Sequence, residues 1–381
     1  MDIHVVQSGE SLWEIAQHYQ VPLVGIVALN GLAYPERLVP GQALVIPSMP
    51  PVFAPERPVI EINAYTYQPV KEAAAEIVQR NGLLSTVLPF AYHVTENGNL
   101  DDLDDQESIA AAYAHSIMPL MPIVNFSLNE SGADVAHAIF TSPVARENLV
   151  SSVIRVMQQK GYRGLNIDFE SVRPEDRRGF NDFLQFVVNR LHPLGFSVST
   201  AVMPKTAIDQ PRAEYIAYDY EAHGRIVDFV VLMTYEWGYR LGPPQAISPV
   251  NEMKRVVEYA LSVMPANKIS LGFETYARDW LLPHKEGQEA ETFSPKEALE
   301  RAICNGVSIQ FNEAAQSPFY TYVDANGSAH EVWFEDARSA QAKFDLVRLY
   351  NLRGISYWAL GFPYPENWAL LESNFSVGKW L

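Results

Sequence analysis

The sequence contains a single cysteine, Cys304, among 381 residues. One cysteine excludes an intrachain disulfide and a cysteine-rich metal site, and a lone cysteine is more often a small buried apolar side chain than a reactive thiol. No apolar run is long enough to span a membrane. The N-terminus "MDIHVVQSGE" lacks the basic start and apolar core of a secretory signal. We therefore expect a protein made without a secretory signal and without a membrane partner.

Basic residues are also scarce. Lysine and arginine number 28 against 45 aspartates and glutamates, which gives a formal net charge of -17. A nucleic-acid partner requires a basic surface, so this balance argues against one. The length favours one large domain or two unequal domains, and we expect a monomer.

Residues 1–47 are predicted to form a small unit with the order β-α-α-β. "HVVQ" is a short strand, and "SGESLWEIAQHY" is a helix with Ser8 as a possible N-cap and Ser11 as a second candidate. "PLVGIVALN" is a second helix that Gly31 is placed to end. "LVPGQALVIP" is a turn followed by a strand. The proline-rich stretch 48–58 then predicts a stiff, extended linker.

Three parts of this unit, "VVQSGESLWEIAQHY", "LNGL" and "LVPGQALVIP", resemble the LysM module in motif and order. The resemblance implies binding of glycans that contain N-acetylglucosamine, chiefly peptidoglycan or chitin. It places the glycan between the loop after the first strand and the loop after the second helix. The glycan-binding residues that it implies are Ser8, Gly9, Glu10, Ser11, Leu12, Leu29, Asn30 and Gly31.

From residue 59 to 381, eight short β-like runs alternate with helical stretches, which predicts an α/β fold with a closed (β/α)8 TIM barrel. The runs are "VIEINAYTY", "STVLPFAY", "MPIVNFS", "GLNIDFE", "FSVSTAVMP", "DFVVLMTYEW", "KISLGFETY" and "GISYWALGF". The segment exceeds the roughly 250 residues typical of that fold. We place a small α+β insertion between strands seven and eight, at about 277–333, with a hairpin that turns at Asn326-Gly327.

The fourth run, "RGLNIDFESV", alternates between an apolar face and a polar face. In a barrel the outer face packs on helices, and the inner face opens at its C-terminal end into the active site. This places Leu165, Ile167 and Phe169 outside, and it places Asn166, Asp168 and Glu170 inside, with Glu170 at the rim.

Two carboxylates on one face of a strand repel each other, which raises the pKa of one of them. Either Glu170 holds a proton near neutral pH while Asp168 carries the charge, or the two carboxyl groups share the proton. A protonated carboxyl at the mouth of a barrel is a general acid, and glycosidic bond cleavage requires one.

Four stretches resemble family 18 glycoside hydrolases. In "RGLNIDFE", Gly164, Asp168 and Glu170 match the family signature, whereas Arg163 and Asn166 replace two aspartates. The other matching residues lie on strands six, seven and eight: Met233 and Tyr235, with Glu236 in place of aspartate; Gly272, Tyr276 and Arg278; and Trp358.

The family resemblance implies retaining, substrate-assisted hydrolysis without a metal or organic cofactor. Glu170 would act as acid and then base, Asp168 would hold the substrate acetamido group, Tyr235 would donate a hydrogen bond to its oxygen, and Trp358 would form the floor. Met233 is expected to pack beneath the site. Further residues expected to line or shape the cleft are Asn63, Tyr65, Tyr67, Glu236, Trp237, Tyr276 and Arg278.

Asn166 is the main departure from the family pattern. With one negative charge missing beneath it, Asp168 should be less readily protonated, although Asn166 can still hydrogen-bond to it. We interpret this replacement as tuning of the site rather than loss of activity.

A LysM module followed by a family 18 barrel resembles the spore cortex-lytic N-acetylglucosaminidases. That resemblance implies cleavage of peptidoglycan after N-acetylglucosamine during germination, in the coat and cortex region of a Gram-positive spore-former, or a cell wall-associated role. One alternative is a chitinase or another endo-β-N-acetylglucosaminidase. A second is a glycan-binding protein without activity, which Glu170 argues against.

Overall fold

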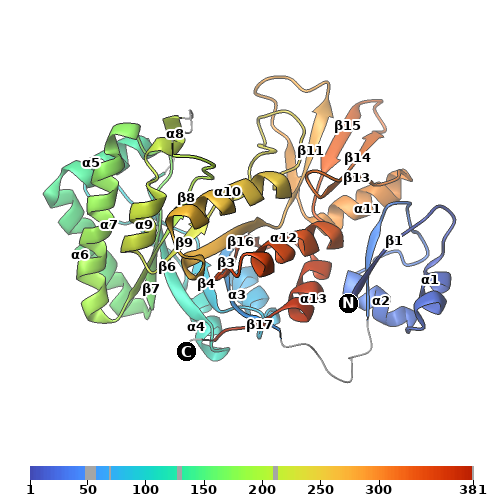
Figure 1. The fold of residues 1–381 in the computed structure, drawn as a ribbon, viewed down its shortest axis with the longest axis horizontal. Coiled ribbons are helices and arrows are strands. Elements are labelled where there is room, and N and C mark those ends of the chain that lie inside the picture. Colours follow the sequence, from blue (N-terminus) through green and yellow to red (C-terminus); the bar gives the residue numbers. More distant parts are fainter. Residues whose placement is uncertain (48–56, 68–69, 127–130, 209–212, 380–381) are drawn as a thin grey trace.

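The structure, a computed structural model, describes residues 1–47, 57–67, 70–126, 131–208 and 213–379. A small N-terminal unit lies at one side of a large barrel, and an insertion projects from the barrel beside it (Figure 1). Of the predicted linker 48–58, residues 48–56 lie outside the described ranges.

The N-terminal unit has the predicted order, β1 (Asp2–Val5), α1 (Leu12–Tyr19), α2 (Leu23–Asn30) and β2 (Ala43–Ile46). Strand β1 pairs antiparallel with β2. The N-cap of α1 is Ser11, which forms a reciprocal capping box with Glu14, so the first candidate, Ser8, is wrong. Gly31 ends α2 in the left-handed conformation, with φ of 56°, as predicted.

Asn30 fixes α2 to β2. Its Nδ2 donates to the carbonyl oxygens of Ile26 and Val45, both at 2.8 Å, and its Oδ1 accepts from the Val45 amide at 2.7 Å. The side chain is only 2% exposed. Its hydrogen-bonding groups are therefore used inside the unit, and the prediction that the Asn30 side chain contacts glycan is wrong.

The barrel is closed as predicted. Its strands are β3 (Val59–Thr66), β4 (Thr86–Pro89), β6 (Met118–Val124), β7 (Gly164–Asp168), β8 (Ser197–Val202), β9 (Phe229–Leu232), β10 (Ile269–Glu274) and β16 (Gly354–Leu360). Neighbours in this order pair in parallel, and β16 returns to pair with β3. Two short strands extend the sheet, β5 (Tyr92–His93) beside β6 and β17 (Ser376–Val377) beside β3.

Helices surround the barrel because each strand presents an apolar outer face to them (Figure 1). They are α3 (Val70–Gln79), α4 (Gln106–Ala114), α5 (Gly132–Thr141), α6 (Pro143–Lys160), α7 (Arg177–Leu191), α8 (Ala213–Ile216), α9 (Tyr220–Ile226), α10 (Val250–Val263), α12 (Ala337–Leu349) and α13 (Pro365–Asn374).

Strand β7 shows the predicted division of faces. Leu165, Ile167 and Phe169 are buried in the core between strands and helices. The Phe169 ring stacks on Phe180 and Phe183 of α7, with centroids 6.3 and 5.8 Å away. The alternate residues of the strand therefore face the barrel interior.

The insertion between β10 and β16 is also confirmed. It contains β11 (Ala277–Leu282), β12 (Glu291–Phe293), α11 (Pro295–Asn305), β13 (Gln310–Asn312), β14 (Ser317–Val323) and β15 (Ala329–Trp333). The strands form an antiparallel sheet in the order β12-β11-β15-β14-β13. The hairpin β14–β15 turns through Asn326-Gly327, where Gly327 has a φ of 84°. Cys304 of α11 is exposed, contrary to our expectation of a buried side chain.

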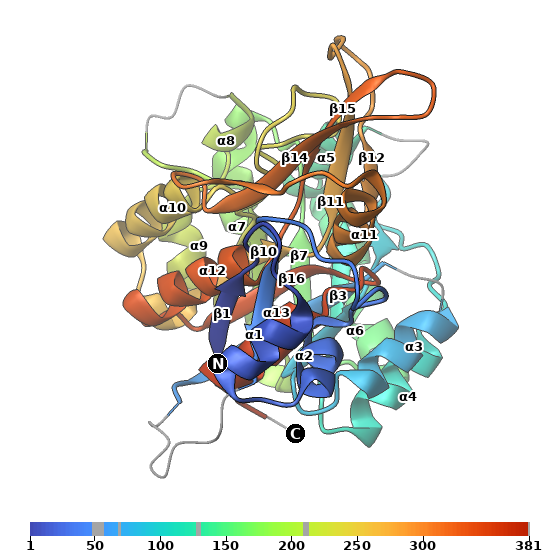
Figure 2. The same ribbon diagram turned by 90° about the vertical axis from the view of Figure 1, so that its right-hand side faces the viewer.

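The N-terminal unit packs against both the barrel and the insertion (Figure 2). Ala43 and Val45 of β2 belong to the main core. The Ile309 amide donates to the Pro40 carbonyl at 2.8 Å, and Arg338 Nη2 donates to the Gly41 carbonyl at 3.0 Å. Among the described residues, no helix is long and apolar enough to cross a membrane.

We predict that Asn30→Ala destabilises the N-terminal unit by about 2 kcal/mol, because it leaves the buried Val45 amide without an acceptor. Hydrogen exchange should show faster exchange at the Val45 amide than in wild type. The control is Gln17→Ala on the exposed face of α1, which should leave exchange at Val45 unchanged. Equal exchange in all three proteins would show that Asn30 does not hold α2 on β2.

Candidate active site

The centre of the candidate site is the carboxyl pair at the end of β7. Asp168 is the last residue of the strand and is 5% exposed, whereas Glu170 lies two residues further, partly exposed at the rim. Asp168 Oδ1 is buried and has no hydrogen-bond partner among the described residues. A buried acceptor without a partner is costly, so this oxygen is available to a donor group on a ligand.

Burial shapes the protonation of both groups. Burial, followed by the neighbouring charge of Glu170, raises the pKa of Asp168 well above its usual range. Burial, followed by the charge of Glu236, raises the pKa of Glu170. The larger rise at the deeper carboxyl favours Asp168 as the group that holds the proton while the site is empty, rather than Glu170 with a charged Asp168.

Asn166 lies one layer deeper. Its Oδ1 accepts from the Tyr65 hydroxyl at 2.9 Å, and its Nδ2 donates to Ser199 Oγ at 3.0 Å. These contacts join β7 to β3 and β8 across the barrel. The hydrogen bonds shown for Asn166 therefore go to Tyr65 and Ser199, and not to Asp168 as we had considered.

Aromatic side chains pack together in the barrel interior around Tyr65, which contacts Asn166. Trp358 of β16 lies edge-to-face with Tyr65 at 5.5 Å and with Phe90 at 4.6 Å between ring centroids. Met233 and Tyr235 belong to the same interior cluster, with Met233 buried as expected. Burial raises the pKa of Tyr235 well above its usual range, so its hydroxyl stays a hydrogen-bond donor at every relevant pH.

Glu236, Tyr276 and Arg278 form a bracket between the loop after β9 and strand β11 of the insertion. Arg278 donates to both carboxylate oxygens of Glu236, at 2.7 and 2.9 Å, and the Tyr276 hydroxyl also donates to Glu236. Glu236 has a φ of 68°, a left-handed conformation that is strained for this residue. The bidentate pair supports that strained backbone beside Tyr235. The structure thus favours an anchoring role for these three residues over direct contact with substrate.

Two predicted cleft residues lie elsewhere. Asn63 is 1% exposed and is hydrogen-bonded to Thr86 and Ser356 inside the barrel. Trp237 packs against the main core outside the barrel interior. The prediction of a cleft-lining role is wrong for Asn63, because alternation along a strand does not show how deep in the barrel a residue lies, and for the half-buried Trp237 it stays a prediction.

Asn125, at the end of β6, was missed in the sequence. Its Nδ2 donates to the Glu170 carbonyl at 2.7 Å and its Oδ1 accepts from the Glu170 amide at 2.8 Å. The Tyr218 hydroxyl donates to the neighbouring Phe169 carbonyl at 2.8 Å. These contacts hold the backbone of the carboxyl pair. The one available signal was a polar residue directly after the apolar run of strand three.

The predicted glycan residues of the N-terminal unit line three different pockets. Ser8, Gly9 and Glu10 line one of about 430 Å³ with His4 and His18. Glu10, Ser11 and Leu12 line a second of about 750 Å³, which Trp13 and Ile303 also border. Trp13 is 63% exposed and was not singled out in the sequence.

The loop after α2 faces the barrel. Gly31 lines a third pocket, of about 500 Å³, and a Cβ on Gly31 would lie 2.8 Å from Pro365 Cγ. Leu29 packs against the main core. The two predicted loops thus line different pockets.

Comparison with known proteins defines the class. Residues 132–362 match Glycosyl hydrolases family 18, and residues 4–47 match the LysM domain. The chain belongs to glycoside hydrolase family 18 and is a glycoside hydrolase with an N-terminal LysM domain.

Relatives that match the whole chain are more specific. The "Cortical fragment-lytic enzyme" of Bacillus subtilis (strain 168) is 37% identical over 433 aligned residues, covering 100% of this chain and 99% of the relative. The crystal structure of the Bacillus megaterium QM B1551 spore cortex-lytic enzyme SleL superposes with a TM-score of 0.94 at 32% identity, covering 100% and 99% of the two chains. A chitinase from Chromobacterium violaceum gives 0.77 at 27% identity and covers 83% and 99%.

We predict that Asp168→Asn stabilises the folded protein near neutral pH. A raised folded-state pKa means that wild type loses stability as the pH rises from the unfolded value near 3.9, and asparagine carries no such penalty. The gain should reach about 1.4 kcal/mol or more, the equivalent of one pKa unit. Unfolding measured from pH 3 to 8 should show a difference that grows with pH.

The exposed Asp104→Asn serves as the control and should show no such trend. If Asp168→Asn and wild type kept the same difference in stability at every pH, Asp168 would not be the group that holds the proton.

We predict that Asn166→Asp folds normally, because a carboxylate can accept hydrogen bonds from both the Tyr65 and Ser199 hydroxyls. The added charge should raise the pKa of the carboxyl pair and move the pH–rate profile upward by about one unit. Circular dichroism checks folding, and kcat/KM against pH checks the shift. An unmoved profile would show that position 166 is not coupled to Asp168.

Proposed function

We propose that the protein is a peptidoglycan hydrolase, an N-acetylglucosaminidase that cleaves β-1,4 bonds after N-acetylglucosamine in spore cortex fragments. The observation that carries the proposal is the Asp168–Glu170 pair, whose Asp168 Oδ1 has no hydrogen-bond partner among the described residues, in the same barrel interior as Tyr235 and Trp358. Full-length similarity to cortical fragment-lytic enzymes supports the choice of substrate.

In the proposed reaction Glu170 donates its proton to the glycosidic oxygen, and the C–O bond to the anomeric carbon breaks. The carbonyl oxygen of the substrate's own acetamido group attacks that carbon and forms an oxazolinium ion. Glu170, now a carboxylate, takes a proton from water, whose oxygen attacks the same carbon and reopens the ring. The two displacements retain the anomeric configuration.

Asp168 and Tyr235 bind the acetamido group. Asp168 Oδ1 accepts from its N–H, and the negative charge on Asp168 balances the positive charge that develops on the ring. The Tyr235 hydroxyl donates to the acetamido oxygen. Trp358 supplies a flat apolar surface beneath the sugar. In the empty site Asp168 holds the proton; when substrate binds, this proton passes to Glu170, which can then donate it to the glycosidic oxygen, and Asp168 becomes the carboxylate that binds the acetamido N–H.

The proposal assigns residues 1–47 to a glycan-binding module, 48–58 to a linker and 59–381 to the catalytic barrel. The LysM match over 4–47 supports the first of these assignments, and the family 18 match over 132–362 lies within the segment assigned to the barrel. The partner is a glycan containing N-acetylglucosamine, met in the cortex of a Gram-positive spore. Contacts of the LysM module with glycan through Ser8, Gly9, Glu10, Ser11, Leu12 and Gly31 remain part of the proposal.

Chitin is the second candidate substrate. Its repeating unit offers the same acetamido group to Asp168, and the chitinase from C. violaceum shares the fold over 83% of this chain. Cortex is favoured because several relatives that match the whole chain are cortical fragment-lytic or spore cortex-lytic enzymes.

We predict that Glu170→Gln lowers turnover by a factor of about 10³ or more and leaves glycan binding intact, because glutamine keeps the shape but donates no proton. Release of reducing ends measures turnover, and calorimetry measures binding. Glu175→Gln is the matched control, since Glu175 is exposed on the short helix after the site and should keep full activity. Wild-type turnover in Glu170→Gln would remove the proposed acid.

Digestion of purified cortex beside colloidal chitin, followed by mass analysis, identifies the substrate. We expect cortex products that end in reducing N-acetylglucosamine. Products that end in reducing muramic acid would overturn the glucosaminidase assignment, and faster cleavage of chitin would favour the second candidate.

A further inference from the structure

A pocket of about 500 Å³ lies where the LysM module meets the rim of the barrel. We call it the junction pocket. It is bordered by the LysM module, by α3, by the loop after β16 and by the first turn of α11, elements that lie together around the module in Figure 2. The lining residues that carry the argument are Gly31, Ala75, Gln79, Lys296, Gly361 and Pro363.

The walls of the junction pocket are fixed to one another. The Lys296 amide donates to the Pro363 carbonyl at 3.2 Å, which ties α11 to the loop after β16. Gly31 lies against Pro365, at the start of α13. The pocket is therefore a feature of the assembled chain that no single unit forms alone.

The junction pocket shares a loop with the candidate active site. Residues 361–363 directly follow β16. This strand carries Trp358, the floor of the site in the proposed function. Phe362 lies 5.7 Å from Tyr276 between ring centroids, whereas its neighbours Gly361 and Pro363 line the junction pocket. Tyr67, 67% exposed, lies 5.9 Å from Trp358 and continues the aromatic surface at the rim. The loop of residues 361–363 therefore connects the residues around Trp358 with the lining of the junction pocket.

The chemistry of the lining suits a sugar chain. Gln79, Lys296 and Glu72 offer donors and an acceptor for hydroxyl and acetamido groups, and Ala75 and Pro363 offer apolar surface. Arg80 also belongs to this lining, but its guanidinium pairs with Glu76 at 3.7 Å and lies 4.7 Å over the Trp368 ring. Pockets of this size, with a few polar groups on an apolar wall, are typical of ligand sites.

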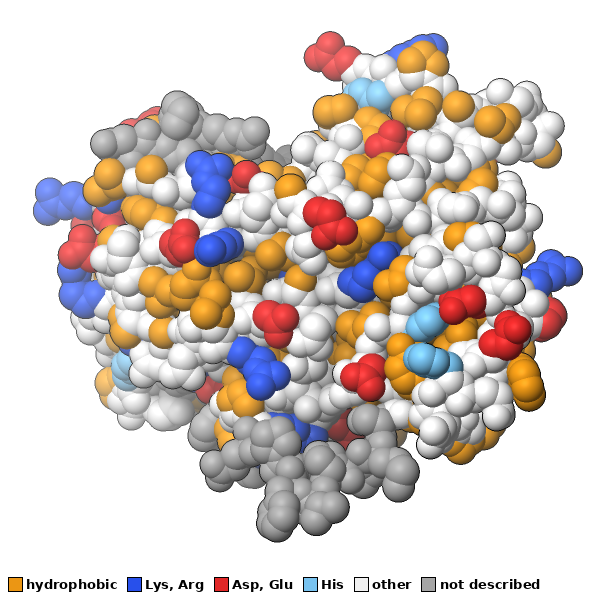
Figure 3. Space-filling view, turned by 45° about the vertical axis from the view of Figure 1, so that its right-hand side comes forward, with side chains coloured by type: hydrophobic (Ala, Val, Ile, Leu, Met, Phe, Trp, Pro, Cys, Tyr) orange, Lys and Arg blue, Asp and Glu red, His pale blue; other side chains and the backbone are white. Residues whose placement is uncertain are grey.

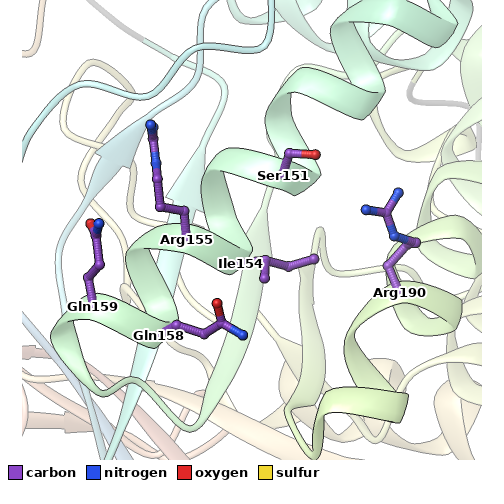
Figure 4. A pocket seen from close by; sticks show the side chains of 6 residues that line it. All are labelled: Ser151, Ile154, Arg155, Gln158, Gln159 and Arg190. Carbon is purple, nitrogen blue, oxygen red and sulfur yellow. The ribbon is translucent and has the colours of Figure 1, made fainter.

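A second pocket, of about 430 Å³, lies between α6 and α7 and differs from the junction pocket because only these two helices line it (Figure 4). It is lined by Ser151, Ile154, Arg155, Gln158, Gln159 and Arg190, and Arg190 is already paired with Glu147. It lies on the side of the barrel away from the LysM module and borders none of the residues of the candidate site (Figure 1).

Figure 3 shows charged side chains of both signs scattered over the face where the large and small parts of the molecule meet. We infer that the junction pocket binds the glycan strand of the substrate beyond the sugars held in the barrel, and guides it from the catalytic rim toward the LysM module. This inference rests on the proposed function. It makes the barrel and the module two ends of one continuous binding surface, which favours strands long enough to reach both.

Filling the pocket tests the inference. Ala75→Tyr places a ring in the junction pocket, and Val78→Tyr places the same ring on the same helix at an exposed position outside the pocket lining. For long cortex glycan strands, freed of peptides, we expect Ala75→Tyr to raise KM about five- to tenfold with kcat within twofold of wild type. With tetrasaccharide fragments, both variants should match wild type.

Lys296→Ala combined with Gln79→Ala removes two of the hydrogen-bond donors of the pocket and should also raise KM for long strands only. This double variant decides the outcome if Ala75→Tyr does not fold, as judged by circular dichroism. Equal KM for long strands in wild type and in the variants would overturn the inference, as would an equal loss on tetrasaccharides.

A binding experiment separates this inference from the proposed function. Calorimetry with long strands is repeated in the Glu170→Gln background, where no cleavage is required. If wild type fails to cleave cortex glycan but Ala75→Tyr weakens strand binding five- to tenfold, the proposed function is wrong and the pocket is still a glycan site. If cleavage occurs and strand binding is the same with and without Ala75→Tyr, the pocket assignment alone is wrong.

Discussion

Once the barrel closes around the two carboxyl groups at the inner end of β7, ionising both of them costs free energy. The closing pair, β16 with β3, removes the strand's inner face from water, and Asp168 and Glu170 then compete for protons. The same burial leaves Asp168 Oδ1 without a hydrogen-bond partner in the part of the chain that the structure describes. The reactivity of the site and its cost in stability therefore have one physical origin, and a bound acetamido group relieves part of that cost.

The rest of the chain supports this pair at increasing distance. Asn125 and Tyr218 hold its backbone, and Asn166 ties the strand beneath it to β3 and β8. Further out, the bracket from Glu236 to Arg278 fixes the loop that carries Tyr235 to the insertion. The insertion in turn contacts the LysM module through the hydrogen bond from the Ile309 amide to the Pro40 carbonyl. Catalytic geometry and the position of the glycan-binding module are thus set by connected parts of one framework.

Local sequence patterns predict much of the fold and part of the candidate site. Alternation in "GLNIDFE" predicts both faces of β7, and Asn326-Gly327 predicts the hairpin of the insertion. The patterns do not show partners distant in sequence. Nothing near Asn30 indicates that its amide is used by Val45, and nothing near Glu236 shows that Arg278 takes its carboxylate. Asn63 and Tyr65 alternate alike, but only the closed barrel shows that Asn63 lies below the cleft.

The central claim is that burial and mutual repulsion keep a proton on the carboxyl pair above the ordinary range of acidic side chains. Carbon-13 NMR titration of the side-chain carboxyl carbons of Asp168 and Glu170, assigned with single substitutions, measures this directly. The account predicts that both titrate at raised pH and that Asp168 keeps its proton to the higher pH. Titration of both carboxyl groups near pH 4, the value for exposed side chains, would contradict it.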